Sequence, residues 1–374
     1  MQTPAHFFPD NLFSNFFTKT KTKLVLLAIL WLLTGCHASS VTSPDYSTQW
    51  VQTGPDGTYG HFITAIAVNG SSIFVGAASS GVGDSSGGVY RSTDNGSHWT
   101  KKSLGLPPTG PVGVGAFAVL GSNIFVGFPA PAGSSGGPYR STDNGDSWTL
   151  ASNGFFPNGP TFVNFNQVTA FAVIGSSLYG ATGGLYDGVF LSKDSGKSWT
   201  GIGLADRFVT SLAVSGSNLF AGISSQTLSR DTMGVYLTTN NGTSWTAVHN
   251  GLPGTINESE TTALAVSGTN LFAGIHGPGG GIYRSTDNGT HWTDMIASST
   301  GFGPVYAFAV SSTNLFAATP GHLLLSKDSG ESWTNCDTPL LHTAGVFSLS
   351  VSGTNLYAGT GSIGVWYCPL SAFQ

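Results

Sequence analysis

Short apolar runs separated by polar turns recur along the chain between residues 48 and 368. Seven segments share one pattern, in which an apolar strand is followed by a short turn, which contains glycine in six of them, and then by Asn or Ser, Leu or Ile, and Phe or Tyr. Successive segments begin 41 to 54 residues apart, which is the repeat length of a β-propeller blade. The segments are Ala65–Gly76, Phe117–Gly127, Phe171–Ala181, Leu212–Gly222, Leu264–Gly274, Phe308–Ala318 and Leu349–Gly359.

The residue types within each segment predict strands. Second strands such as Leu271-Phe272-Ala273 are apolar at consecutive positions, which favours a sheet covered on both faces. First strands such as Leu264-Ala265-Val266 combine one large residue with small ones, as expected where blades crowd toward a central axis. No stretch after residue 36 has a convincing helical period, so we predict an all-β fold.

An octamer of the form [ST]-x-[DN]-x-G-x-x-W runs in step with these segments and occurs six times. Its Asp or Asn, followed two residues later by Gly, is typical of a hairpin turn in which the side chain caps main-chain N–H groups. Its Trp begins the returning strand and is large enough to anchor the turn to a neighbouring blade. We therefore predict a structural role for Asp94, Trp99, Asp143, Trp148, Asp194, Trp199, Asn240, Trp245, Asp287, Trp292, Asp328 and Trp333.

The seven segments outnumber the six octamers, and this mismatch predicts how the ring closes. After the seventh segment the chain supplies a third strand over Gly364–Pro369 and then ends. Before the first segment, Thr48–Thr53 resembles a fourth strand and carries Trp50. Pairing of these two segments would complete the last blade and leave no open edge. We therefore predict a seven-bladed propeller of four-stranded antiparallel blades over residues 48–374, closed by the N-terminal strand.

The octamer resembles the Asp-box, or BNR repeat, over about residues 48–368. This repeat occurs in sialidases, sortilin-type receptors, some glycoside hydrolases and the photosystem II assembly-factor propellers. The resemblance implies the propeller fold and says little about activity. It also implies that the octamer turns lie away from the face that binds ligands.

The N-terminal region is predicted to direct export and lipid attachment. Three lysines at positions 19, 21 and 23 precede the apolar run Leu24–Leu33, which is typical of a signal peptide and too short to span a bilayer. Leu33-Thr34-Gly35-Cys36 resembles a bacterial lipobox, which implies cleavage after residue 35 and acylation of Cys36. Residues 36–47 would then form a flexible tether. His37 follows the cysteine where an inner-membrane retention signal has Asp, and this favours the outer membrane.

Composition excludes some classes of partner. Removal of residues 1–35 takes three lysines and one aspartate from 13 basic and 18 acidic residues and leaves a formal charge of −7. A nucleic-acid-binding protein needs a basic face, so no nucleic-acid partner is expected. We expect a monomer without a cofactor. Repeat alignment places Cys336 and Cys368 at different heights on neighbouring blades, which argues against a disulfide between them.

The longer, unlike connections are predicted to lie on one face of the ring, opposite the octamers, and we call it the variable face. Because repeats maintain the scaffold and unlike loops differ, this is the expected binding face. These connections are Ala77–Gly87, Phe128–Gly137, Leu150–Gln167, Gly201–Phe208, Ser224–Gly234, Val248–Glu260, His276–Gly280, Asp294–Gly303 and Asn335–Ala344.

Sialidase chemistry finds little support on this face. A sialidase clamps its substrate with three arginines, but Arg91, Arg140 and Arg284 occupy one repeat position just before an octamer and cannot converge. Arg207 and Arg230 then remain, one short of a clamp.

A glycosidase of the two-carboxylate kind would need a pair of acids about 5–10 Å apart. Six acids outside the octamers, in connections of the predicted variable face, are the candidates for such a pair. They are Asp84, Asp187, Asp206, Asp231, Glu258 and Glu260. The alternative is that they are solvated loop residues.

The most unusual connection contains Phe155, Phe156, Phe162 and Phe165. These rings could form an exposed patch for a partner, or they could pack onto the propeller. The histidines at 249, 276, 322 and 342 lie on the variable face without a metal-ligand spacing, so no metal site is expected.

Together these patterns favour a non-catalytic cell-envelope lipoprotein that binds a protein or glycan partner on the variable face. Candidate contacts are the four phenylalanines, Arg207 and Arg230. A carbohydrate-active enzyme using two of the six acids, and a membrane-complex assembly factor, stay open as alternatives.

Overall fold

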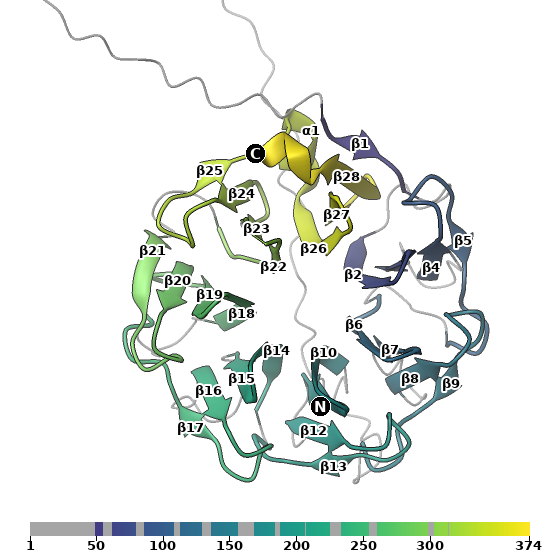
Figure 1. The fold of residues 1–374 in the computed structure, drawn as a ribbon, viewed down its shortest axis with the longest axis horizontal. Coiled ribbons are helices and arrows are strands. Elements are labelled where there is room, and N and C mark those ends of the chain that lie inside the picture. The colour runs from purple at the N-terminus through teal and green to yellow at the C-terminus, as the bar shows by residue number, and fades with distance from the viewer. Residues whose placement is uncertain are drawn as a thin grey trace, which may run out of the picture. The chain divides into compact units, whose positions relative to one another are not determined.

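The computed structural model describes residues 49–54, 62–79, 86–107, 113–128, 136–155, 168–183, 188–205, 207–224, 233–253, 260–297, 303–312 and 314–374. These residues form a ring of seven four-stranded antiparallel sheets, as predicted (Figure 1). Within the described residues, no helix is long and apolar enough to cross a membrane.

Each of the first six blades uses four consecutive strands. Blades 1 to 3 are β2 (Ile63–Asn69), β3 (Ser72–Ala77), β4 (Gly88–Ser92) and β5 (Thr100–Lys101); β6 (Ala116–Leu120), β7 (Asn123–Phe128), β8 (Gly137–Ser141) and β9 (Thr149–Leu150); and β10 (Val168–Ile174), β11 (Ser177–Thr182), β12 (Val189–Ser192) and β13 (Thr200–Gly201). Blades 4 to 6 are β14 (Val209–Ser215), β15 (Asn218–Ile223), β16 (Gly234–Thr238) and β17 (Thr246–Ala247); β18 (Glu260–Ser267), β19 (Asn270–His276), β20 (Gly281–Ser285) and β21 (Thr293–Ala297); and β22 (Ala307–Val310), β23 (Leu315–Ala318), β24 (Leu323–Ser326) and β25 (Thr334–Asn335).

Blade 7 joins the two ends of the propeller, as the sequence predicts. Its strands are β26 (Val346–Ser352), β27 (Asn355–Thr360), β28 (Val365–Pro369) and β1 (Val51–Gln52). Val51 pairs with Tyr367 and Gln52 pairs with Trp366, and the main-chain N–H of Thr53 donates to Val365 at 2.8 Å. The N-terminal strand therefore completes blade 7, and the two-residue β1 is the outer edge of this sheet.

Seven apolar clusters hold the described blades together. Most residues of each cluster come from two neighbouring blades. The cluster between blades 1 and 2, for example, contains Phe74 of β3 and Phe128 of β7, both fully buried. The cluster between blades 6 and 7 contains Trp50, Cys336 and Cys368. Both of these cysteines are free and buried, in agreement with the expectation that they do not form a disulfide.

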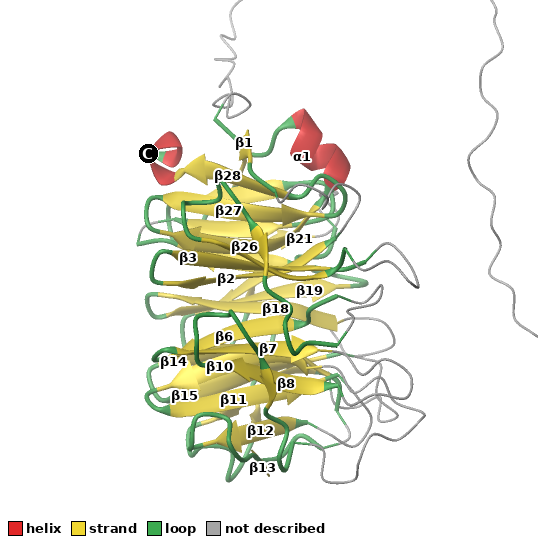
Figure 2. Ribbon diagram, turned by 90° about the vertical axis from the view of Figure 1, so that its right-hand side faces the viewer, coloured by secondary structure: helices red, strands yellow, loops and turns green. Residues whose placement is uncertain are grey.

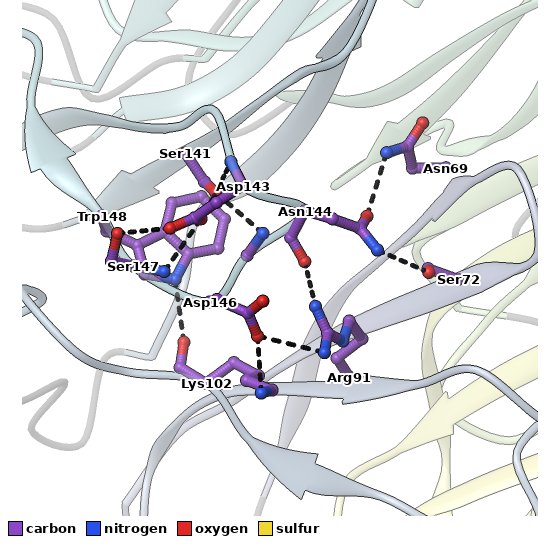
Figure 3. Close-up of polar contacts among 11 residues, drawn as sticks. Asn69, Ser72, Arg91, Lys102, Ser141, Asp143, Asn144, Asp146, Ser147 and Trp148 are labelled. Atoms are coloured by element: carbon purple, nitrogen blue, oxygen red, sulfur yellow. Dashed lines mark hydrogen bonds and ion pairs between the residues drawn. The ribbon is translucent and has the colours of Figure 1, made fainter.

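The octamer turn of blade 2 shows how each motif folds (Figure 3). The hydroxyl of Ser141 donates to Asp143 at 2.7 Å and accepts from the main-chain N–H of Gly145 at 2.7 Å. The carboxylate of Asp143 accepts from both the main-chain N–H and the hydroxyl of Ser147. These bonds hold the pKa of Asp143 at about 2, the Ser147 hydroxyl bond having the largest effect.

Two successive residues of this turn, Asn144 and Gly145, have left-handed backbone conformations. A Cβ on Gly145 would lie 2.5 Å from the ring of Phe74 in blade 1. Two features therefore require glycine at this position: its φ of 84° and its close packing against the neighbouring blade. Asn144 also receives a bond from Arg91 on its carbonyl and donates to Ser72 at 3.1 Å.

Tryptophan side chains link six of the seven pairs of neighbouring blades. In six cases the indole N–H donates to the main-chain carbonyl that lies three residues beyond the equivalent tryptophan of the preceding blade. The pairs are Trp99 with Thr53, Trp148 with Lys102, Trp199 with Ala151, Trp245 with Ile202, Trp292 with Val248, and Trp50 with Cys336. Trp50 therefore has the octamer tryptophan's role in blade 7, although no octamer surrounds it.

Trp333 is the exception in this series. Its indole N–H donates to Gly330 of its own octamer at 3.2 Å. The acceptor expected by position is Met295, but the register of β20 and β21 shifts there, because Tyr283 pairs with Asp294 and Ile282 with Ile296. Met295 is thus the extra residue of a bulge, and bulges redirect main-chain groups.

The two faces of the ring differ as predicted (Figure 2). Turns from the first to the second strand and the octamer turns lie on one face, and the strand ends that lead into the other connections lie on the opposite, variable face. The helix α1 (Pro339–Ala344) follows blade 6 on the variable face, whereas the C-terminal 3-10 helix η3 (Leu370–Phe373) lies on the opposite face. No helix was expected, and Thr338 caps α1 by accepting from Leu341 at 3.1 Å.

Candidate functional site

Of the six candidate acids, the structure describes Glu260. The other five, Asp84, Asp187, Asp206, Asp231 and Glu258, lie outside the described residues. So do Phe156, Phe162, Phe165, Arg230 and Cys36. The predictions made for these residues therefore stay predictions.

Glu260 begins β18 on the variable face and lines a cavity of about 270 Å³ between blades 4 and 5. Its strand partner is His276 of β19. The remaining lining mixes aliphatic and polar groups, and no Phe, Tyr or Trp side chain lies among the described lining residues. It consists of Met233, Gly234, His249, Asn250, Gly251, Leu252, Pro253, Thr261 and Ile275.

Two buried polar atoms in the cavity wall lack a hydrogen bond within the described part of the chain. They are Nδ1 of His249 and Oγ1 of Thr261. Burial lowers the pKa of His249. A hydrogen bond with the main chain of Val235 opposes this shift, and the positive charge of Arg207 adds to it. His249 is therefore predominantly a neutral imidazole near pH 7, with one nitrogen free to accept. Buried polar atoms without partners are uncommon, so the cavity is prepared for a ligand or for water.

Arg207 lies at the edge of this site, in the segment that leads into β14. Its guanidinium stacks 4.7 Å from the ring centre of Tyr236 and donates to the Tyr236 hydroxyl at 2.8 Å. The Tyr236 ring in turn lies edge-on to His249, with ring centres 6.0 Å apart. The structure thus brings Arg207 and Glu260, two of the sequence candidates, to neighbouring blades beside one cavity.

Phe155 is not available to a partner. It is fully buried between blades 2 and 3, stacked on Phe190 with ring centres 4.6 Å apart and edge-on to Trp199 at 4.8 Å. Of the two roles open to this residue, packing onto the propeller is the one found. Its proposed binding role is therefore wrong, because the ring fills the space between two blades.

Aromatic side chains also reach the surface close to the central axis. Tyr306 and Phe347 stack with ring centres 4.8 Å apart, and Phe62 meets Phe347 edge-on at 5.0 Å. Phe62 is 48% exposed and Tyr306 is 38% exposed. The two precede the first strands of blades 1 and 6, whereas Phe347 belongs to the first strand of blade 7. Their sequence separation gives no sign of this stack, which arises from closure of the ring.

The three equivalent arginines lie on separate blades and serve the scaffold, as their repeat position predicts. Arg91 and Arg284 each donate to the octamer of the next blade and pair with an acid there, Asp146 at 3.1 Å and Glu331 at 2.7 Å. Arg140 also donates to the next octamer, at 3.0 Å. None of the three takes part in the cavity, which leaves no arginine clamp among the described residues.

A cluster that sequence spacing did not reveal lies beside blade 6. His322 from the turn between β23 and β24, Asp337 after β25, and His342 in α1 approach one another, and one ligand atom from each lies within 4.8 Å of the others. Oδ2 of Asp337 is 3.3 Å from Nδ1 of His322 and 3.6 Å from Nδ1 of His342. The fold of α1 back over the blade creates this convergence, and no helix was expected there.

Comparison with known proteins supports the fold and goes no further. The chain matches no protein-family model and no curated protein. The GH74 xyloglucanase from Xanthomonas campestris is similar in structure, with 16% identity and a TM-score of 0.60 over 87% of this chain and 54% of that one. The chain therefore spans about half the length of that enzyme.

Two structures of YCF48 are similar as well. YCF48 bound to D1 peptide has 16% identity and a TM-score of 0.60 over 86% of this chain and 97% of that one. YCF48 from Cyanidioschyzon merolae has 16% identity and a TM-score of 0.58, over 86% and 98% of the two chains. At this identity the likeness shows a shared propeller architecture.

Proposed function

We propose that this protein is a non-catalytic cell-envelope lipoprotein whose propeller binds a protein partner on the variable face. The cavity between blades 4 and 5 is the contact site. Two buried polar atoms in the cavity wall carry the proposal. They are Nδ1 of His249 and Oγ1 of Thr261, and neither has a hydrogen-bond partner in the described part of the chain. A side chain or main-chain amide of a partner would satisfy them, and Glu260 would accept from a further donor.

The walls of the cavity favour a peptide over a sugar. Its apolar lining consists of the aliphatic residues Met233, Leu252, Pro253 and Ile275. Such a lining suits an aliphatic side chain, whereas sugars are commonly held against aromatic faces. The exposed Tyr306, on another part of the variable face, would extend the contact area toward the axis.

The similar structures lend support by analogy. YCF48 matches this chain over nearly its whole length and has been observed with a peptide bound. The xyloglucanase is about twice as long, so the chain lacks a counterpart for much of that enzyme. The Asp-box resemblance is compatible with both kinds of protein.

Hydrolysis of a glycosidic bond by two carboxylates would need an acid in addition to Glu260. Among the described lining residues of the cavity Glu260 is the single acid, and such hydrolysis requires a second carboxyl group about 5–10 Å away. A glycoside hydrolase is therefore the second candidate, favoured by the likeness to the GH74 fold. Hydrolysis of xyloglucan by the purified protein, lost on Glu260→Gln, would replace our proposal with this one.

A photocrosslinking experiment in the producing cell tests the binding proposal. A photoreactive residue replaces Leu252 in the cavity, and a matched variant carries it at Thr142, an exposed octamer position on the opposite face. We expect a discrete protein adduct from position 252 that disappears when Thr261→Val and His249→Phe are introduced together. Identical adducts from both positions, or no adduct from position 252, would contradict the proposal.

The lipid anchor is tested separately. Cys36 lies in the lipobox-like sequence, outside the described residues. Wild-type protein is expected to incorporate labelled palmitate and to sediment with the outer membrane. Cys36→Ser is expected to lose the label and to leave the membrane fraction, because the cysteine provides the acylation site. Unchanged labelling of the variant would exclude this anchor.

A further inference from the structure

The cluster of His322, Asp337 and His342 has the composition of a metal site. It offers two imidazoles and one carboxylate from three different segments. A tetrahedral zinc site with bonds of about 2.0–2.2 Å separates its ligand atoms by roughly 3.4 Å. The two distances from Asp337 Oδ2 to the histidine Nδ1 atoms, 3.3 and 3.6 Å, match that separation.

The hydrogen bonds around the cluster leave Oδ2 of Asp337 without a donor among the described residues. Oδ1 of Asn335 accepts from the main-chain N–H of Asp337 at 3.1 Å, which fixes the orientation of this amide. Its Nδ2 therefore faces Nδ1 of His322 at 3.1 Å. Since an amide nitrogen only donates, Nδ1 of His322 carries a lone pair in this arrangement. Oδ2 of Asp337 lies 3.3 Å from the same ring nitrogen, which donates no hydrogen bond to it in this arrangement.

Asp337 itself is buried at this point. Its side chain is 10% exposed, and its Oδ2 makes no hydrogen bond in the described part of the chain. An acidic oxygen enclosed without a donor is costly unless a proton or a cation lies beside it. This unpartnered oxygen lies between the two imidazoles. Its position is evidence for a cation separate from the residue types in the cluster, and it indicates where the cation would bind.

We propose that His322, Asp337 and His342 bind a first-row divalent transition metal ion of the zinc type. Imidazole and carboxylate ligands suit this class of ion. The side chain of His342 is 52% exposed, so the fourth position is open to water. The metal would displace the exposed amide of Asn335 from His322, and turning this amide away would also break its bond from the main-chain N–H of Asp337.

The expected consequence is a brace at the junction of blades 6 and 7. Helix α1 has six residues, and its one buried side chain is Leu341. Helices this short are marginal without tertiary contacts. A metal bound by His342 and Asp337 would fix α1 to the end of blade 6, and binding to the folded state alone raises stability. This role does not depend on the partner binding proposed above.

Thermal unfolding with and without zinc tests the proposal. The untagged chain, treated with chelator, is titrated with ZnCl₂, and the metal content is measured after dialysis. Wild type is expected to bind one equivalent and to show a rise in Tm that chelator reverses. His342→Ala is expected to retain its fold, because this residue is exposed, and to bind zinc at least tenfold more weakly. Asp337→Asn should have the same effect on binding.

Two octamer histidines supply matched controls. His98 and His291 also lie against a carboxylate, at 2.7 and 2.8 Å, but each forms an exposed pair without a third ligand among the residues that the structure describes. His98→Ala and His291→Ala should leave zinc binding unchanged. Cobalt provides a second readout, since visible absorption of bound Co²⁺ should be lost in His322→Ala. The proposal is overturned if wild type binds no equivalent of zinc, or if the His98 variant loses as much as the His342 variant.

Discussion

The indole N–H of Trp50 donates to the main-chain carbonyl of Cys336 at 3.3 Å, across 286 residues of sequence. This contact connects the strand that closes blade 7 to the end of blade 6. It repeats, without an octamer, the bond that five octamer tryptophans make to the preceding blade. The hydrogen bond from tryptophan to the preceding blade is therefore kept in blade 7, although the octamer sequence that surrounds the other tryptophans is not.

Trp50→Ala is expected to destabilise the propeller by about 3–5 kcal/mol, the usual cost of truncating a buried aromatic side chain. Trp50 is 6% exposed and packs edge-on against Phe373, and its loss also weakens closure of the ring. Urea unfolding followed by tryptophan fluorescence measures the change. The control is Trp333→Ala, whose side chain is less buried. An equal loss in the two variants would contradict a special role for Trp50.

The hydrogen bond itself can be separated from the packing. Trp148→Phe retains an aromatic ring and removes the donor to Lys102. We expect a loss of about 1–3 kcal/mol, since the carbonyl is left without its partner. Trp333→Phe removes a bond within one octamer and should cost less. Chemical denaturation of both variants under the same conditions checks the order, and a larger cost for Trp333→Phe would refute it.

The fold could be predicted from sequence because its determinants are local and periodic. Trp50 was assigned to blade 7 from the mismatch between seven segments and six octamers, and the pairing of Val51 with Tyr367 confirms it. The left-handed conformation of the residue before each octamer glycine was missed. Asn and Ser tolerate that conformation, but the residue type alone does not require it.

The site was harder to predict because convergence across blades leaves no spacing in the sequence. The sequence presents His322 and His342 as separate histidines, and nothing in its spacing indicates Asp337, the residue that joins them. The phenylalanine-rich loop predicts Phe155 as a contact residue, but its side chain fills the gap between blades 2 and 3. Burial depends on the neighbouring blade, and a single segment does not specify it.

Arg140 suggests a stabilising substitution. Its equivalents Arg91 and Arg284 pair with an acid on the next blade, whereas Lys197 occupies that acid's octamer position opposite Arg140. Lys197→Glu should therefore add an ion pair worth about 0.2–1 kcal/mol, a small gain because the position is exposed.

Thermal unfolding at low and high salt measures this gain, which should shrink as salt screens the pair. The control is Lys193→Glu, which changes the charge equally at the second octamer position. In the described octamers no residue at that position makes an ion pair. A gain of the same size in Lys193→Glu would mean that net charge, and not the pair, is responsible.

The octamer carboxylates predict sensitivity to acid. The hydroxyl and main-chain N–H of Ser147 lower the pKa of Asp143 from 3.8 to about 2. A carboxylate with a lower pKa in the folded protein binds its proton less readily there than in the unfolded chain. Its contribution to stability is therefore complete above pH 4 and is lost as the pH falls toward 2.

Asp143→Asn should make the free energy of unfolding less dependent on pH between 4 and 2, by at most about one proton. Blade 4 shows that the turn accepts this change, because Asn240 already makes the equivalent bonds to Ser244. The reverse substitution, Asn240→Asp, should steepen the same dependence. Urea unfolding at a series of pH values measures both slopes, and if neither changes, these carboxylates do not control the response of the propeller to acid.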